Sequence, residues 1–439
     1  MYKLEIKLKQ HTPLIHFQHD QDGATLRASE VKPKLDKYII KHAFHDNFDE
    51  CKEFLVGYNP QKRDDSIKTL KGKWNSGVRA LNYKMKIISS GDLEEYMLAS
   101  YIKEEYLNEL NRNSISAISN TPFFAQEKQN GQIIKNINPL AEWNKIEKKG
   151  IIEKKEVTVT ILSNTKIVET LSKHIQPYFV ATNFGTRQSK GFGCFFPTEI
   201  KLNDNSIHLV DIDVIMKQHF KFVYKKSLPN SNLAELLSTI NNDYRLIKSG
   251  RTRPYAKSKL MLYAESLDPN IGWDKKYIKE YTNDSFETEN GDKYVLKCRD
   301  DHKKDCYSNK DSYRYFRALL GLAEQFEFLL VNPPLGQSKN KMIVKVKNAD
   351  IQRYQSPLLF KVFDNTIYLV GNEVAPEMLN KPFDFLVNFQ KDSGYKDEPV
   401  DESGEPIRTP QDFSLRSFIS FAMQDNTKGA SLGYITIKS

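Results

Sequence analysis

The segment 184–193 combines glycines with side chains that can bind an anion. Glycines at positions 185, 191 and 193 flank a polar run that carries two cations and three other hydrogen-bonding side chains: Thr186, Arg187, Gln188, Ser189 and Lys190. Glycine reaches positive φ without steric cost, so successive N–H groups can converge on an anion while arginine and lysine supply charge. The spacing matches neither the P-loop nor the dinucleotide-binding fingerprint. We expect a loop that holds the backbone of a polyanion, and a solvated hairpin turn is the alternative.

A second concentration of positive charge lies at 248–259, where five cations occur without an acid. Gly250 and Pro254 favour an irregular backbone there, and Tyr255 can stack on a base. Each contact with a phosphate would release counterions and make binding sensitive to salt. The candidate contacts are Arg251, Arg253, Tyr255, Lys257 and Lys259. A solvated basic loop is the alternative.

Acid–base side chains follow the first predicted strand. His16 can take the 2′-OH proton in RNA cleavage without a metal, and Asp20 or Asp22 can do so if its pKa rises. Aspartate beside Gly23 also suits an ordinary turn. These three residues are therefore candidates for an endoribonuclease site, as an alternative to a chain without catalytic activity.

One further group has the atoms that zinc prefers: Cys298, Asp300, Asp301, His302 and Cys306. The two cysteines do not form a CxxC pair, and no second pair follows nearby, so we expect no metal site. The sequence contains no GxSxG, HExxH or Walker pattern. We therefore expect no cofactor and no nucleotide-driven chemistry.

The overall composition is that of a basic globular protein. The 439 residues are 39% hydrophobic and 28% charged, with a net charge of +9 and a pI near 9.0. The positive charge favours an anionic partner. No apolar stretch reaches the ~18 residues that span a membrane, and no signal peptide is recognisable. The four cysteines form no disulfide framework, so we expect a cytoplasmic protein.

Strands and helices alternate in the part of the chain that must position these residues. Alternating apolar residues predict strands at 2–9, 81–88, 157–162 and 194–200, and helical spacing predicts helices from position 33 and over 165–178. The polar segments 45–80 and 128–150 are predicted to be insertions, the first of them irregular. This order predicts an α+β fold of the ferredoxin-like type.

The second half repeats the pattern less clearly. Strands are predicted at 221–224, 342–347, 357–363 and 366–370, and helices at 233–246 and 315–328. Polar residues accumulate near 201–215, where we place the boundary between two domains, 1–205 and 206–439.

Three segments together resemble the RAMP superfamily of CRISPR proteins. Thr12-Pro-Leu14 followed by Thr25-Leu-Arg-Ala-Ser-Glu-Val-Lys32 resembles its first strand and early helix, and the segment 185–193 resembles its glycine-rich loop. Arg353-Tyr-Gln-Ser-Pro-Leu358 is similar to a segment of the subunit that caps the crRNA 3′ end in type III-B (Cmr) effector complexes. Two positions depart from the family pattern: Pro33 replaces a usual glycine, and Asp36 stands where a cation is common.

The resemblance implies tandem RRM-like RAMP domains that bind crRNA and target RNA by shape and backbone, beside other RAMP subunits of an effector complex. The side chains that it assigns to RNA are Arg27, Lys32, Arg187, Ser189, Lys190 and Arg353, with the backbone of Gly191 and Gly193 approaching phosphate. It implies a non-catalytic subunit. However, RAMP backbone subunits cut target RNA with an aspartate after the first strand, and Asp20 or Asp22 occupies a comparable place.

Overall fold

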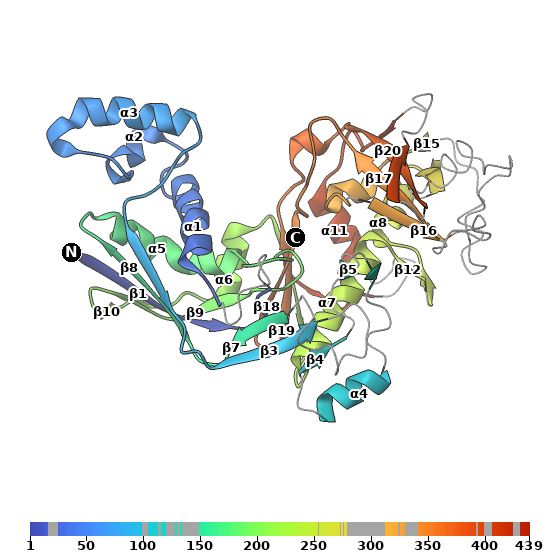
Figure 1. The fold of residues 1–439 in the computed structure, drawn as a ribbon, viewed down its shortest axis with the longest axis horizontal. Coiled ribbons are helices and arrows are strands. Elements are labelled where there is room, and N and C mark those ends of the chain that lie inside the picture. The colour runs from blue at the N-terminus through green and yellow to red at the C-terminus, as the bar shows by residue number, and fades with distance from the viewer. Residues whose placement is uncertain are drawn as a thin grey trace. The chain divides into compact units, whose positions relative to one another are not determined.

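The computed structural model describes residues 1–15, 25–98, 104–112, 116–119, 128–129, 132–133, 149–252, 254–272, 274, 276–278, 312–323, 325–329, 341–391, 394–398, 406–424 and 431–439 (Figure 1). The chain divides into two compact units. The first contains residues 1–241, 359–370 and 435–438, and the second contains 242–358, 371–434 and 439. The fold is α+β, with several small sheets. The predicted boundary at 205/206 stays a prediction.

A five-stranded antiparallel sheet forms the base of the first unit. Its order is β10-β9-β1-β8-β2, with bounds Asn205–Ser206, Phe195–Leu202, Tyr2–Gln10, Val157–Ser163 and Lys84–Ile88. Burial alternates along β1 and β8, so every second side chain points into the core. The strands predicted from alternation in the first half of the chain are confirmed.

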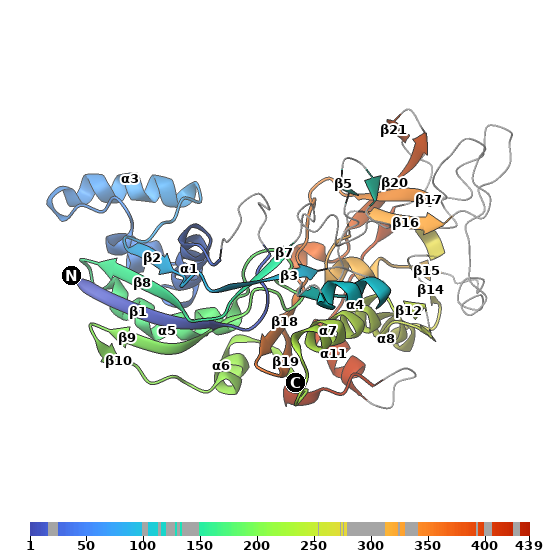
Figure 2. The ribbon, with the colours of Figure 1, turned by 60° about the horizontal axis from the view of Figure 1, so that its bottom comes forward.

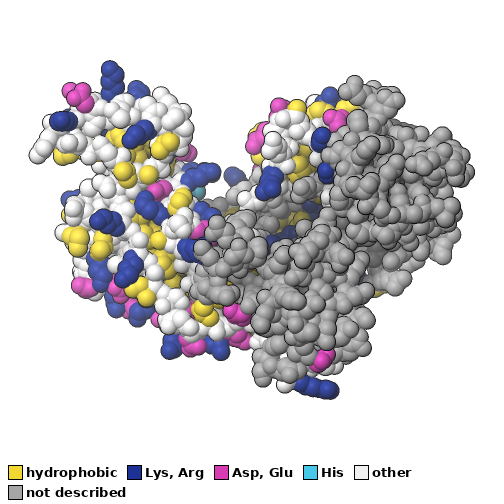
Figure 3. All heavy atoms as spheres, in the orientation of Figure 1, with side chains coloured by type: hydrophobic (Ala, Val, Ile, Leu, Met, Phe, Trp, Pro, Cys, Tyr) yellow, Lys and Arg dark blue, Asp and Glu magenta, His cyan; other side chains and the backbone are white. Residues whose placement is uncertain are grey.

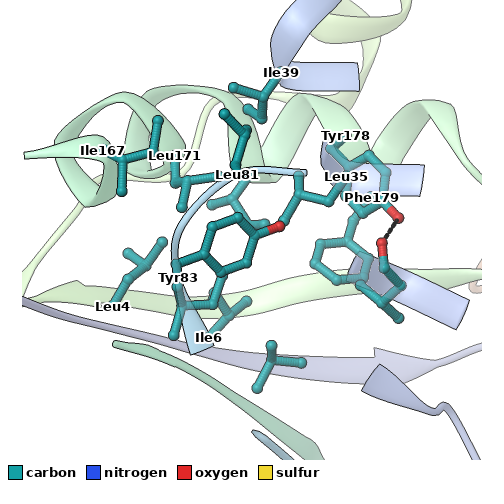
Figure 4. Packing of buried hydrophobic residues seen from close by; sticks show 14 of the residues in the cluster. Leu4, Ile6, Leu35, Ile39, Leu81, Tyr83, Ile167, Leu171, Tyr178 and Phe179 are labelled. Carbon is teal, nitrogen blue, oxygen red and sulfur yellow. Dashed lines mark hydrogen bonds between the residues drawn. The ribbon is translucent and has the colours of Figure 1, made fainter. Parts of the chain in front are cut away.

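Two helices cover one face of this sheet, as Figures 1 and 2 show. They are α1 (Ala28–His42) and α5 (Ile167–Ala181). The core between them contains Leu4, Ile6, Leu35 and Leu171, and Figure 4 shows these side chains interleaved. The Tyr178 hydroxyl donates a 3.0 Å hydrogen bond to the backbone oxygen of Val31, which ties the two helices together.

The polar segment after α1 is helical rather than irregular. It forms α2 (Phe48–Cys51), η1 (Lys52–Phe54), η2 (Pro60–Lys62) and α3 (Arg63–Asn75). Leu70 and Trp74 of α3 are buried in the main core cluster. These few apolar side chains are enough to dock an otherwise exposed helix, which a composition-based prediction misses.

Further small elements precede β8 in the first unit. They are β3 (Leu93–Leu98), α4 (Glu104–Arg112), β4 (Ala117–Ile118), β5 (Lys128–Gln129), β6 (Gln132–Ile133) and β7 (Lys149–Glu153). β3 pairs with both β4 and β7. Leu14, just after β1, bridges to Ile151 of β7, so this small sheet is tied to the end of the central strand.

The second sheet of the first unit is assembled from distant parts of the sequence. Its order is β18-β19-β11-β23, with bounds Leu358–Phe363, Thr366–Gly371, Phe222–Ser227 and Ile435–Lys438. Helices α6 (Ile212–His219) and α7 (Leu233–Lys248) flank β11 in the sequence. The chain therefore returns to the first unit twice after leaving it at position 241.

The second unit is built around another sheet. Its longer strands are β16 (Gln325–Leu329), β17 (Lys341–Lys347), β20 (Pro382–Lys391) and β21 (Gly394–Glu398), with β22 (Ile407–Arg408) beside β20. The short pairs are β12 (Arg251–Thr252) with β13 (Tyr255–Ala256) and β14 (Ile271–Gly272) with β15 (Ser312–Tyr313). Its described helices include α8 (Lys259–Leu267), η5 (Phe316–Leu320), η6 (Pro376–Met378) and α11 (Leu415–Met423).

The predicted helix at 315–328 is wrong. A single 3-10 segment, η5, ends at Leu320 and is followed by Gly321, whose φ is +104°, and the chain then enters strand β16. β16 pairs antiparallel with β17, so strand pairing overrides the helical spacing of the apolar residues. Within the described part of the chain, no helix has the length and apolar character needed to cross a membrane.

Candidate nucleic-acid interface

The glycine-rich loop connects α5 to β9 and is closed at its base. Asn183 and Cys194 form an antiparallel bridge, and the Phe184 N–H donates to the Gly193 oxygen at 3.0 Å. Phe184 and Phe192 are buried on either side of the tip. The tip itself, residues 186–190, is half-buried. The loop is therefore a rigid stem that presents a short polar tip.

The glycines have the positive φ angles that the sequence predicts, at +74°, +81° and +65° for Gly185, Gly191 and Gly193. Close packing explains the need for two of them. A Cβ at Gly193 would lie 2.0 Å from the Phe184 oxygen, and one at Gly185 would lie 2.5 Å from the Ile15 oxygen.

Several of the loop amides, that of Thr186 in the tip included, donate hydrogen bonds inside the protein. Gly193 donates its N–H to the Pro13 oxygen at 2.9 Å, and Gly185 donates to Oε1 of Glu30 at 2.7 Å. The same Glu30 oxygen accepts from Nζ of Lys34 at 2.9 Å. An internal carboxylate thus accepts the hydrogen bond of the Gly185 amide.

A tight turn shapes the tip. Lys190 donates its N–H to the Arg187 oxygen at 2.8 Å, and Arg187 has a left-handed φ of +58°. The Gln188 side chain donates back to the Gly185 oxygen at 2.6 Å. Burial, and secondarily the charge of Arg187, lowers the pKa of Lys190 to about 8. Two cations therefore lie close together, and one of them gives up its proton more readily than an ordinary lysine.

Strand β18 holds the far side of the tip. Phe360 donates its N–H to the Ser189 oxygen at 3.1 Å, and the Asn183 side chain donates to the oxygens of both Phe360 (2.9 Å) and Gln188 (2.6 Å). These bonds fix the backbone of the loop against a strand that lies some 170 positions later in the sequence.

Lys361, the next residue of β18, is fully buried. Its ammonium group donates to the oxygens of Phe179 (2.9 Å) and Thr182 (2.8 Å) at the end of α5, and burial lowers its pKa to about 8. A cation there satisfies carbonyls that the helix leaves unpaired. Sequence reasoning missed Asn183 and Lys361, although a lysine inside the apolar run 357–363 was a usable signal.

The two candidates near the start of α1 have different surroundings. Lys32 donates to Oδ2 of Asp36 (2.8 Å) and to the Leu81 oxygen (2.9 Å), and its Nζ lies 4.1 Å from the centre of the Tyr83 ring. Its ammonium group is thus part of an internal network, in which Asp36 is its partner. Arg27 precedes α1, and its Nη2 is buried without a hydrogen-bond partner in the structure.

The remaining basic candidates belong to the second unit. Arg251 and Tyr255 lie in the short hairpin β12–β13, and the Tyr255 side chain is exposed. Lys257 forms an ion pair with Glu265 at 2.7 Å. Lys259 is only 2% exposed, so burial corrects the expectation that it faces a ligand.

The second unit brings the basic segment near the segment of Arg353, which is exposed. Lys248 donates to the Gly321 oxygen at 2.5 Å, and the neighbouring Leu322 donates its N–H to the Tyr354 oxygen at 3.1 Å. Both segments therefore meet at the turn that ends η5.

Several candidates lie outside the described residues. These are His16, Asp20, Asp22, Arg253, and the possible zinc ligands Cys298, Asp300, Asp301, His302 and Cys306. Among the residues that the structure does describe, no group of three or more His, Cys, Asp or Glu side chains is arranged to hold a metal ion.

Two solved structures are similar to this chain. The crystal structure of apo Cmr1 from Pyrococcus furiosus is 11% identical and covers 100% of this chain and 99% of its own, with a TM-score of 0.35. A chain of the type III-B Cmr-beta complex, bound to cognate target RNA and AMPPnP in the presence of ssDNA, is 13% identical and covers 84% of this chain and 94% of its own, with a TM-score of 0.33. No curated protein sequence matches.

The family models cover almost the whole chain. Residues 1–251 match the Cmr1 N-terminal domain, and residues 255–436 match the Cmr1 C-terminal domain. The glycine-rich loop lies within the first match, and the segment of Arg353 lies within the second. The chain therefore belongs to the Cmr1 family.

Proposed function

We propose that this chain is a non-catalytic RNA-binding subunit of a type III-B CRISPR effector complex, which acts in antiviral defence. It would hold the 3′ part of the crRNA and help to capture the complementary target RNA, in contact with other RAMP subunits. Membership of the Cmr1 family supports the assignment to such a complex.

The observation that carries the RNA-binding part is the geometry of the glycine-rich loop. Its stem is fixed by backbone bonds and by β18, while residues 186–190 remain half-buried with Arg187 and Lys190 in one turn. A fixed backbone lowers the entropy cost of placing two cations on a phosphate chain. Cations and hydroxyls of this kind suit recognition of the RNA backbone.

The finer architecture belongs to the same proposal. The first sheet, with α1 and α5 on one face, is consistent with a ferredoxin-like (RRM-like) domain. We propose that a second such domain follows within 206–439, that the protein works in the cytoplasm, and that it needs no cofactor.

The test is the salt dependence of RNA binding. Replacing both Arg187→Ala and Lys190→Ala should weaken binding of single-stranded RNA and reduce the slope of log affinity against log salt by about 1.4. The matched control replaces Lys68 and Lys71, two exposed lysines of α3, by alanine. A loop variant whose slope equals that of the control contradicts the proposal.

The alternative is an endoribonuclease that cuts target RNA through Asp20 or Asp22, or that processes crRNA through a histidine such as His16. Incubation of the wild-type chain with crRNA and complementary target RNA, with and without EDTA, separates the two functions. Cleavage by the wild type that is lost in Asp20→Ala or Asp22→Ala contradicts the non-catalytic assignment.

A further inference from the structure

The face of the five-stranded sheet opposite α1 and α5 carries an ordered array of charged and polar side chains. The strand register places them in three rows across β2, β8 and β1, and two of the rows continue onto β9. The rows are Lys84, Leu162 and Lys3; Lys86, Thr160, Glu5 and Lys201; and Ile88, Thr158, Lys7 and Glu199. All of these side chains are exposed or half-buried, in contrast to their buried neighbours in β1 and β8.

This face is positively charged, because its rows contain five lysines and two glutamates. Both glutamates form ion pairs with lysines of the same face. Glu199 forms ion pairs of 2.8 Å with both Lys7 and Lys201, and Glu5 forms one of 2.8 Å with Lys3. Hydrogen bonds from the two lysines lower the pKa of Glu199 to about 2. These ion pairs hold the charges on the central strands in defined positions.

The uncompensated charge lies on the edge strand β2. Lys84 and Lys86 are exposed and have no ion pair within the described part of the chain. Ile88, two residues further along the same face, is 47% exposed. Figure 3 shows basic and acidic side chains interleaved over β1, β9 and β10, at the lower left of that view. Two lysines without an ion pair to any described residue, beside an exposed aliphatic side chain, are the most distinctive part of this surface.

The composition of the face favours a protein over RNA. The three rows contain no aromatic residue, whereas sheets that bind single-stranded RNA stack its bases on aromatic side chains. Phe196, further along β9, is buried against His11 and Phe363 and offers no ring to a base. Aliphatic and threonine side chains surrounded by charges instead match the apolar centre and polar rim of a protein interface.

We propose that this uncovered sheet face docks an acidic surface of a neighbouring protein subunit, with Lys84 and Lys86 pairing with its carboxylates and Ile88 packing against its apolar centre. Only the identity of the neighbour, another subunit of a type III-B effector complex, rests on the proposed function. Charge complementarity of this kind governs the rate and specificity of association.

The test is incorporation of charge-reversed variants into the reconstituted complex. Lys84→Glu with Lys86→Glu is mixed with the remaining subunits and crRNA, in competition with tagged wild type, and incorporation is read by native mass spectrometry. We expect at least a tenfold loss relative to the control Lys68→Glu with Lys71→Glu, which makes the same change of charge on α3. The neutral variant Lys84→Gln with Lys86→Gln should show a smaller loss and guards against misfolding.

A second measurement separates a protein partner from RNA. The isolated variant should bind single-stranded RNA as tightly as the α3 control does. The proposal is overturned if the Lys84 and Lys86 variant enters the complex as well as the control does. It is also overturned if this variant, and not the control, loses tenfold in RNA affinity, because the face would then be an RNA-binding surface. The two proposals can fail separately. If the variant with Arg187 and Lys190 replaced binds RNA normally, the proposed RNA role fails, but a loss of incorporation in the Lys84 and Lys86 variant still supports protein docking at this face.

Discussion

Replacing Gly193 by alanine tests whether the stem of the glycine-rich loop is as tightly packed as the structure indicates. Gly193 has a φ of +65°, and an added Cβ would meet the Phe184 oxygen at 2.0 Å and the Phe184 carbonyl carbon at 2.8 Å. Both atoms belong to the backbone, so a side-chain rotation cannot relieve the contact. The Phe184 N–H also bonds to the Gly193 oxygen, which ties the two residues together.

Two costs add in this variant. An alanine in the left-handed region costs about 1–2 kcal/mol, and forcing a methyl group into packed surroundings costs about 1–3 kcal/mol. The free energy of unfolding of the first unit should therefore fall by roughly 2–5 kcal/mol, which corresponds to a decrease in Tm of roughly 5–15 °C for a unit of this size.

Differential scanning calorimetry on the full chain measures this change. Gly72→Ala is the matched control, because Gly72 lies inside α3 and an added Cβ there meets no atom within 4 Å. Alanine at an exposed helical position should raise stability by about 0.5–1 kcal/mol, so the two glycine substitutions should shift Tm in opposite directions. If Gly193→Ala melts within 2 °C of the wild type, the stem is not the rigid support that the RNA-binding argument requires.

Two further predictions concern Lys190, which is half-buried, and Lys361, which is fully buried. Because the pKa of Lys190 is lowered to about 8, its ammonium group loses a proton as the pH rises, and RNA affinity should fall roughly tenfold between pH 7 and pH 9. The variant Lys190→Arg stays charged, so its RNA affinity should not change over this pH range. A wild-type affinity that is equally independent of pH contradicts this role of Lys190. Lys361→Met leaves the oxygens of Phe179 and Thr182 without their donor. The free energy of unfolding, measured by heat or urea, should therefore fall by about 1–3 kcal/mol. Unchanged stability would mean that removal of the buried charge offsets the loss of both hydrogen bonds.

Local patterns predicted the central strands of the first unit because the signals of these strands are local. Strict alternation located β1 and β8, and the glycines of the loop have the positive φ angles expected from their type. The same approach was wrong at 315–328, where apolar residues at helical spacing enter strand β16. Pairing with β17, which starts at Lys341, decides that segment, and no pattern within 315–328 contains this information.

The sequence predicted the tip of the candidate site but not the residues that hold the loop in place. Residue types identified the tip of the loop, but the contacts that hold it come from Glu30 in α1 and from Phe360 and Lys361 in β18. Each contact joins positions more than 100 residues apart, and a single sequence does not show which distant residues meet. Sequence reasoning also assigned Lys32 and Lys259 to RNA, whereas the structure places the first in a network with Asp36 and buries the second.

The origin of these supporting contacts has a consequence for how the protein can be divided. β18, β19 and β23 belong to the first unit although they follow position 357 in the sequence. A fragment that ends at 251, where the family model of the N-terminal domain ends, contains Arg187 and Lys190 but lacks the strand that bonds to Ser189. Such a fragment keeps every cation of the tip and loses part of what fixes the loop backbone. Rigidity of the loop is therefore a property of the whole chain, and RNA affinity has to be measured on the whole chain.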